Sequence, residues 1–208
     1  MGGEGAHTMN EIAVVTAVTG GYDHVGSHVY NQNVDYIFFT DGATEPLDSQ
    51  WQVEILPNNI TNDPRKLAKI PKLNPHMLES LNNYRYVIWI DGSMQIISSD
   101  FVNQILSYMD ASGLVLSPHF DGRNCAYGEA TIRPPKYQME DLDGQCNFYR
   151  SQGFPENYGL CEAGVEARDM TVPLVKEFGE VWFNEVLTWT IQDQVSLGYS
   201  LWKTGLKP

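Results

Sequence analysis

The stretch YVIWIDGS, residues 86–93, decides the fold of this chain, because five consecutive apolar residues run directly into an Asp-Gly-Ser turn sequence. A short apolar run rich in β-branched and aromatic residues, bounded by turn residues, predicts a buried strand. Two earlier runs have the same form: IAVVTAV, residues 12–18, ends at Thr19-Gly20-Gly21, and YIFFT, residues 36–40, ends at Asp41-Gly42. In a parallel sheet these polar ends meet at one edge, which is where ligands bind in such folds.

The rest of the chain continues the alternation of strand and helix patterns. We expect further strands over residues 51–56, 113–116 and 164–170, and helices over part of 63–76 and over 100–109, 172–186 and 191–202. Residues 122–159, rich in Gly, Pro, Asn and Tyr, predict long loops with one helix near residues 137–141. The pattern predicts an α/β fold with a mostly parallel central sheet flanked by helices, and 208 residues without a linker fit a single domain.

The composition argues against several classes of protein. Thirteen Lys and Arg residues against 26 Asp and Glu residues give a net charge of −13, which disfavours nucleic-acid binding and a polybasic membrane contact. No run approaches the roughly 18 apolar residues of a membrane span. Cys125, Cys146 and Cys161 form no C-x-x-C pair, so we expect free thiols and a cytoplasmic protein. Residues 1–8 have the character of a cloning remnant, which leaves 9–208 as the domain.

Asp91 is the first candidate for chemistry, because an ionised carboxylate at the end of a buried strand must be paired or must bind a metal ion. A hard divalent cation that bridges a carboxylate and a diphosphate satisfies this requirement. The alternative is an ordinary turn or a helix N-cap, for which Asp-Gly-Ser is equally suited.

The densest basic stretch of this acidic chain indicates an anion site. Arg65, Lys69 and Lys72 recur at near-helical spacing and are followed by His76. Cations at such spacing share a helix face and suit a diphosphate. The alternative is a solvated basic face of a helix.

Polar groups near the predicted loops leave their roles open. His119 follows a strand and either contacts a ligand or forms a hydrogen-bonded turn. Glu129 and Glu162 suit acid–base chemistry, although the sequence does not pair them. Asp193, followed by Gln194, interrupts an apolar segment and lies either in a cleft or on an exposed helix face.

Taken in order, several segments resemble glycosyltransferases of the GT-A fold over most of the chain. The motifs that carry this resemblance are IAVVTAVTGGYD, DYIFFTD, DPRKLAKIPKLNPH, YRYVIWIDGSMQI, SPHFDGRNCAYGEA, GLCEAGVEAR and VWFNEVLTWTIQDQVSL. The chain is most similar to the N-terminal glycosyltransferase domain of multidomain chlorella-virus proteins that build a capsid glycan. That resemblance implies a location in the host cytoplasm and further domains C-terminal to this one.

The resemblance implies a UDP-sugar donor, a glycan or glycoprotein acceptor and a divalent cation, Mn²⁺ or Mg²⁺. The residues it places at the donor are Thr16, Ala17, Val18, Thr19 and Tyr22 at the uridine, Asp41 at the base or ribose, Arg65 and Lys69 at the diphosphate, and Asp91, Gly92 and Ser93 at the D-x-D position. Asp91 and Ser93 are the implied metal ligands, with Ser93 standing where a second carboxylate is usual. His119, Glu162 and Asp193 are the implied catalytic residues around the transferred sugar, with retention of its anomeric configuration favoured.

Two other functions fit the same sequence. A nucleotidyltransferase that makes nucleotide sugars shares this sheet topology, but is expected to carry cations in the loop after the first strand, where residues 19–23 have none. A non-catalytic glycan-binding module needs only aromatic platforms and acidic loops. The G-x-S-x-G, G-x-x-x-x-G-K-[ST] and G-x-G-x-x-G motifs are missing from the sequence, which disfavours α/β-hydrolases, P-loop NTPases and Rossmann dehydrogenases.

Overall fold

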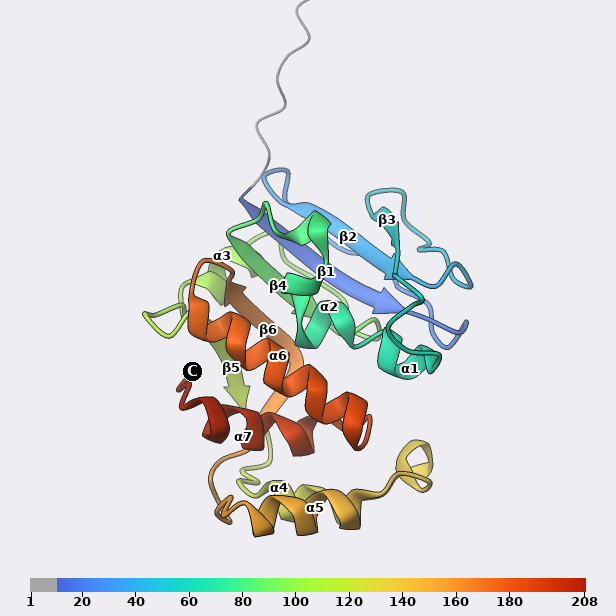
Figure 1. Cartoon of the computed structure of the whole chain (residues 1–208). Helices are drawn as coiled ribbons and strands as arrows, with labels where there is room; N and C mark the ends of the chain where they lie inside the picture. The colour runs from blue at the N-terminus through green and yellow to red at the C-terminus, as the bar shows by residue number, and fades with distance from the viewer. Residues whose placement is uncertain (1–10) are drawn as a thin grey trace, which may run out of the picture.

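Six strands form one sheet in the order β3-β2-β1-β4-β6-β5 (Figure 1). The computed structural model describes residues 11–208, so the expected cloning remnant at residues 1–8 lies outside the described part. The strands are β1 (Ile12–Val18), β2 (Asp35–Thr40), β3 (Gln52–Ile55), β4 (Tyr86–Ile90), β5 (Leu114–Pro118) and β6 (Cys161–Asp169). All run in one direction except β6, which is antiparallel to both of its neighbours. The predicted mostly parallel α/β domain is confirmed.

The polar ends of β1, β2 and β4 lie together, as the sequence predicts. These three strands are adjacent and parallel, so they end at one edge of the sheet, where β5 also ends and β6 begins. We call this the carboxyl edge. Most candidate residues for chemistry named above belong to segments that end or begin near it. His76 does not, because its Nε2 lies 3.2 Å from the carbonyl of Met170, just after β6 ends at the opposite edge of the sheet.

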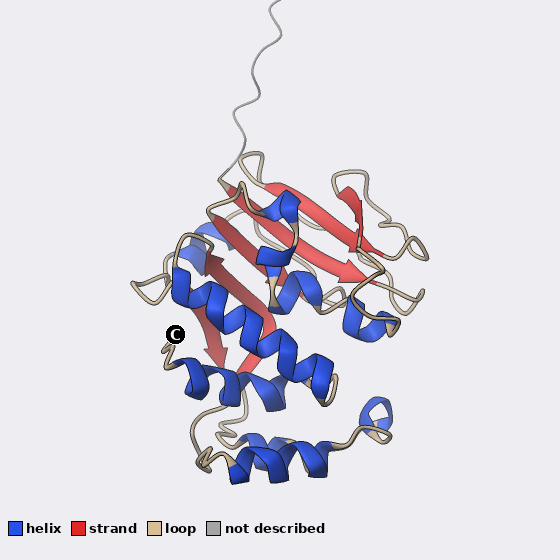
Figure 2. Cartoon of the chain, viewed as in Figure 1, coloured by secondary structure: helices blue, strands red, loops and turns tan. Residues whose placement is uncertain are grey.

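Helices cover both faces of the sheet (Figure 2). The helices are α1 (Pro64–Leu67), α2 (Ile70–Leu73), α3 (Phe101–Leu106), α4 (Ala126–Glu129), α5 (Leu142–Ser151), α6 (Pro173–Thr188) and α7 (Asp193–Thr204), with 3-10 helices η1 (Pro75–Met77), η2 (Glu79–Leu81) and η3 (Pro135–Tyr137). Figure 1 shows α4 and α5 beyond α7, at the end of the molecule toward which β5 points. Local signals set several boundaries: the Asp63 side chain accepts the Arg65 N–H at the start of α1, and Gly205 ends α7 with a φ of 73°.

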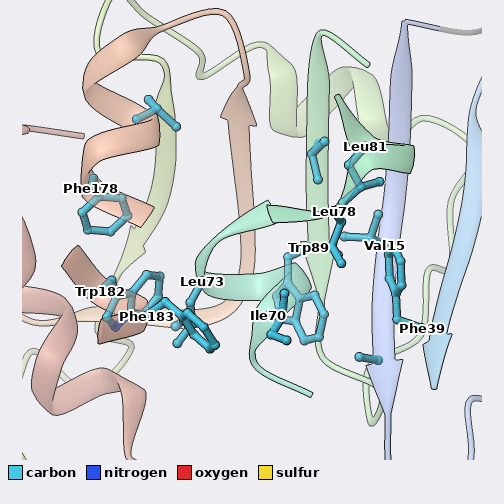
Figure 3. Close-up of a cluster of buried hydrophobic side chains, with 14 of the residues drawn as sticks. Val15, Phe39, Ile70, Leu73, Leu78, Leu81, Trp89, Phe178, Trp182 and Phe183 are labelled. Carbon is cyan, nitrogen blue, oxygen red and sulfur yellow. The ribbon is translucent and has the colours of Figure 1, made fainter. Parts of the chain in front are cut away.

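The core lies on both faces of the sheet, which explains why the strand sequences are apolar without alternation. On the α2 and α6 face, Val15 and Trp89 pack with residues such as Leu73 and Phe178 (Figure 3). On the other face, Val14 and other alternate strand residues pack with Val102 of α3 and its neighbours. The sheet is therefore buried on both sides, and only its edges are available for a ligand.

The segment 122–159 differs from the prediction of long loops with one helix near residues 137–141, which was wrong. It contains α4, η3 and the ten-residue α5, which begins at Leu142. The Asp141 side chain accepts the Gly144 N–H and starts α5, so the predicted helix ends where the real one begins. Leu142, Cys146 and Tyr149 are buried in an aromatic cluster against α7, a tertiary contact that local composition did not reveal.

β6 contains a bulge next to the carboxyl edge. Leu116 of β5 is paired with Glu166, but the next residue, Ser117, is paired with Glu162. The three residues between, Ala163 to Val165, therefore have no partner on β5. Within this bulge the Gly164 carbonyl accepts the N–H of Asp91 at 2.8 Å, so β6 is fixed to the end of β4.

Candidate active site

A pocket of about 240 Å³ opens at the carboxyl edge. Five parts of the chain line it: the end of β1 and its loop, α1 with the turn into α2, the end of β4 and its loop, η3, and the segment between α6 and α7. Its wall is formed by Ala17, Val18, Thr19, Tyr22, Asp23, Arg65, Ala68, Lys69, Trp89, Asp91, Gly92, Ser93, Lys136, Tyr137 and Ile191. The volume is slightly below the 300 to 1,000 Å³, roughly, of typical small-molecule sites, so a larger ligand extends past the exposed Tyr22 at the mouth.

Asp91 lies in this wall and is both paired and accessible. Its Oδ1 accepts the indole N–H of Trp89 at 2.8 Å and lies 3.2 Å from the ammonium of Lys72. Its side chain is still 39% exposed. The Met94 N–H donates to the Asp91 carbonyl, so the ordinary turn that the sequence allowed also forms. Turn formation and ligand contact are therefore compatible at this residue.

Lys69 and Asp91 of the pocket wall form a group of charges with the buried residues Lys72 and Asp193, and we call these four residues the lysine cluster. Asp193 Oδ2 is 2.7 Å from Lys69 Nζ and 2.8 Å from Lys72 Nζ. The side chains of Lys72 and Asp193 are only 3% and 8% exposed. The alternatives of a solvated basic helix face and of an exposed Asp193 are wrong.

The lysine cluster keeps Asp193 ionised. Burial opposes ionisation of this carboxyl group, but the charges of Lys69 and Lys72 outweigh it and hold its pKa well below the ordinary range. Lys72 is desolvated too, yet the carboxylates of Asp193 and Asp91 raise its pKa. Burial lowers the pKa of Lys69, although the charge of Asp193 opposes this shift. Asp193 and Lys72 are therefore a fixed ion pair rather than a proton-exchanging pair.

The second polar group at the carboxyl edge is the histidine cluster: His119, Asp121, Arg123, Glu129 and Glu162. His119 Nδ1 lies 2.6 Å from Asp121 Oδ1, and its Nε2 lies 2.9 Å from Arg123 Nη2 and 3.1 Å from Glu162 Oε1. Arg123 also contacts the buried carboxylate of Glu129. The alternative of a hydrogen-bonded turn is confirmed for His119, since the Gly122 N–H donates to its carbonyl at 3.0 Å, whereas contact with a ligand stays a prediction.

Gln194 connects the two clusters. It follows Asp193 at the start of α7, and its Nε2 donates to Glu162 Oε2 at 3.2 Å and to the Cys161 carbonyl at 3.3 Å. The Asp193-Gln194 pair that interrupts an apolar sequence therefore joins the lysine cluster to β6.

The structure brings most of the predicted donor residues to the pocket wall. Nine of them line it: Ala17, Val18, Thr19, Tyr22, Arg65, Lys69, Asp91, Gly92 and Ser93. Thr16 is fully buried, with an Oγ1 that has no hydrogen-bond partner, and Asp41 accepts the Gly20 N–H at 2.8 Å and so shapes the loop. Neither residue belongs to the wall.

The sequence missed Lys136 and Tyr137, which close the pocket from the far side. They lie in the proline-rich run RPPKY, where no periodicity marks a functional residue. A link from α1 holds the segment that follows: Arg65 lies 3.2 Å from Glu140 and 3.3 Å from Asp63. Arg65, Lys69 and Lys136 therefore surround the pocket with positive charge in a protein whose net charge is −13.

The chain belongs to the TOD1/MUCI70 glycosyltransferase-like domain family, whose model matches residues 6–207. It is 28% identical over 214 residues to the probable hexosyltransferase MUCI70 of Arabidopsis thaliana, a match that covers 89% of this chain and 36% of that protein. The prediction of a glycosyltransferase family is confirmed.

A solved structure agrees with the fold. The apo structure of the WbbM bifunctional glycosyltransferase superposes with a TM-score of 0.53 at 10% identity, over 92% of this chain and 37% of that one. The chain thus spans little more than a third of both proteins. Among residues 11–208, no helix has the length and apolar character to cross a membrane. The GT-A assignment, the viral resemblance, the cytoplasmic location and the further C-terminal domains stay predictions.

Proposed function

We propose that this domain transfers a hexose from a UDP-sugar to a hydroxyl group of a glycan acceptor. The observation that carries the proposal is the pocket at the carboxyl edge, where Arg65, Lys69 and Lys136 face the compensated carboxylate of Asp91. The family and the relative named as a probable hexosyltransferase support it. That the acceptor is a viral capsid glycan rests on the sequence resemblance alone.

The cations of the pocket suit a nucleoside diphosphate. As the bond to the sugar breaks, negative charge grows on the departing diphosphate, and positive groups already in place lower the barrier without rearrangement. Lys69 is held by Asp193 and Arg65 by Asp63 and Glu140, so both positions are fixed before the ligand arrives. The strongly acidic remainder of the protein repels a diphosphate, which makes this local concentration of positive charge necessary.

The pocket also suits a divalent metal ion, Mn²⁺ or Mg²⁺. Within residues 11–208, no group of three or more His, Cys, Asp and Glu side chains is placed to hold one. Asp91 has an accessible carboxylate, and Ser93 adds a hydroxyl on the same wall. One carboxylate with substrate phosphates and water is a usual coordination for Mg²⁺, so these residues fit an ion that is shared with the donor. Such an ion, when bound, supplies additional positive charge at the diphosphate.

Asp193 and the histidine cluster are assigned to the sugar side of the reaction. Because the pKa of Asp193 is lowered, its carboxylate is a poor proton acceptor but a permanent negative charge. A negative charge stabilises an oxocarbenium-like sugar in retaining and inverting reactions alike, so retention of the anomeric configuration rests on the sequence resemblance alone. His119 and Glu162, at the β5 and β6 side of the edge, are assigned to the acceptor.

A screen of UDP release over a panel of UDP-hexoses and UDP-deoxyhexoses, with and without Mn²⁺, tests the proposal. We expect release from one or a few donors, and a loss of at least about 100-fold in the Asp91→Asn variant. Release of pyrophosphate from UTP and a sugar phosphate would instead identify a nucleotidyltransferase. Sugar binding without any response to UDP or Mn²⁺ would identify a glycan-binding module.

A further inference from the structure

Phe120 is an exposed aromatic residue in an unusual setting. Its side chain is 83% exposed, and its ring stacks on that of His119 with a centroid separation of 4.9 Å and an interplanar angle of 26°. Single exposed apolar residues are common and need no explanation. This one, however, follows β5 directly at the carboxyl edge and rests on the histidine cluster.

The imidazole beneath Phe120 is rigidly held. The His119 side chain is 2% exposed, and its backbone N–H donates to the Leu160 carbonyl at 3.0 Å. One ring nitrogen contacts Asp121 and the other contacts Arg123. Phe120 therefore lies on a base that does not rotate, and its second face is open to solvent.

Glu162 contributes an acceptor that lacks a donor. The two ring nitrogens of His119 lie within hydrogen-bond distance of Asp121, Arg123 and Glu162. Glu162 Oε1, 3.1 Å from Nε2, is buried without a hydrogen-bond partner. A buried acceptor left unsatisfied is costly, so a ligand hydroxyl that donates to it binds favourably.

We propose that Phe120 and the histidine cluster form a binding subsite for the acceptor sugar, a pyranoside. This inference rests on the proposed function, because it names the partner of the same site. One face of a pyranose ring carries C–H groups that pack on an aromatic ring, while the ring edge carries hydroxyls. Phe120 receives that face, and the half-exposed carboxylates of Glu162 and Asp121 accept hydroxyl hydrogens.

The subsite lies next to the donor pocket without overlapping it. Glu162 precedes Gly164 by two residues, or about 7 Å of extended chain, and the Gly164 carbonyl accepts the Asp91 N–H. None of Phe120, Asp121 and Glu162 lines the donor pocket. A pyranoside on Phe120 therefore lies beside the donor pocket.

Ligand-observed NMR with methyl pyranosides, in both anomers and with UDP present, tests the subsite. The panel contains methyl glycosides of glucose, galactose, mannose, xylose and rhamnose at millimolar concentrations. We expect at least one to bind, Phe120→Ala to weaken that binding by about tenfold, and Phe120→Trp to restore it. Glu162→Gln should weaken it as well. Tyr108→Ala is the matched control, because Tyr108 is a 75% exposed aromatic residue that precedes β5, at the opposite edge of the sheet.

The outcomes separate this subsite from the proposed function. Because Phe120 is exposed and does not line the donor pocket, Phe120→Ala should melt and bind UDP as the unaltered protein does. If no methyl pyranoside binds while UDP does, or if Phe120→Ala binds the pyranoside unchanged, the subsite is wrong and the donor assignment stands. If neither UDP nor any UDP-sugar binds, the proposed function fails, whatever the pyranosides do.

Discussion

The lysine cluster and the histidine cluster lie at one edge of one sheet, yet they differ in their balance of positive and negative groups and in their exposure to solvent. The lysine cluster holds two ammonium groups and two carboxylates, and its central side chains are almost completely buried. The histidine cluster has three carboxylates against one guanidinium, and Asp121, Arg123 and Glu162 are each about one-third exposed. The first is internally neutral, and the second has excess acceptors.

This difference indicates two ligand chemistries. A neutral, buried group of charges fixes the residues around it and leaves Lys69 and Asp91 aimed at the pocket, as an anionic ligand with its counter-ion requires. An open group with excess acceptors suits an uncharged ligand that donates hydrogen bonds, such as a sugar. The two halves of the edge thus correspond to a charged donor and a neutral acceptor.

Lys72→Met is expected to have the largest effect, because it breaks the neutrality of the lysine cluster. Removal of one partner leaves Asp193 buried with Lys69 alone, and the free energy of unfolding should fall by about 3–5 kcal/mol. Urea denaturation at pH 7 measures this loss. Lys203→Met, at a half-exposed lysine 4.0 Å from Glu185, is the control and should change stability by less than about 1 kcal/mol. Equal effects in the two variants would show that the cluster is not a structural unit.

Asp91→Ala tests whether the accessible member of the lysine cluster serves the ligand. Lys72 keeps Asp193 as a partner, so the fold should survive, while kcat/KM for UDP-sugar should fall about 10²–10³-fold, or about 3–4 kcal/mol. UDP release and thermal melting measure the two effects. Asp23→Ala removes the other carboxylate of the pocket wall as a control. An active Asp91→Ala enzyme would remove this residue from the mechanism.

Asp193→Asn tests, through the pH dependence of stability, whether the lysine cluster holds an ionised carboxylate. A carboxyl group with a lowered pKa in the folded state stabilises the protein above its ordinary pKa of about 4, and this contribution is lost as the pH falls through the folded-state pKa. The stability difference between the unaltered protein and the variant should therefore be constant from pH 8 to pH 5. It should shrink by about 1–2 kcal/mol toward pH 3. Denaturation curves across this range give the answer, and a difference that grows in acid would contradict the ionised lysine cluster.

Glu162→Gln should have the smallest effect on stability. Glu162 is one of three carboxylates in the histidine cluster and is 32% exposed, so its neutralisation should change the unfolding free energy by less than about 0.5 kcal/mol. Sugar binding should weaken in the same variant. A large loss of stability, measured by thermal melting, would mean that Glu162 supports the fold rather than the ligand.

The sequence predicted the sheet and the edge of the site because their signals are local. Apolar runs that end at Asp91 and Asp41 identify strands and the direction in which they end. The rest depended on tertiary contacts. Leu142 to Ser151 form a helix whose buried side packs against α7, and no local sequence pattern predicts this contact. The residues that close the pocket, Lys136 and Tyr137, come from η3, which precedes that helix.

The sequence also could not predict which candidate residues contact one another. Lys72 and Asp193 are 121 residues apart, and the fold, in which α2 packs against α6 and α6 against α7, brings them to 2.8 Å. His119 and Glu162 meet because β5 and β6 are neighbours in the sheet. The sequence named these four residues singly, and the fold decided which of them act together.

The bulge in β6 has a consequence for related domains. Asp91 is fixed to Gly164, while Glu162 is fixed by its register with Ser117. Residues Ala163 to Val165, which have no partner on β5, therefore work as a spacer between the two halves of the edge. Insertion or deletion of one residue in this spacer changes the distance between Asp91 and Glu162, while the residues of the two clusters stay the same. Relatives that join the same sugars through different linkages are therefore expected to differ in the length of this segment more than in the residues on its two sides.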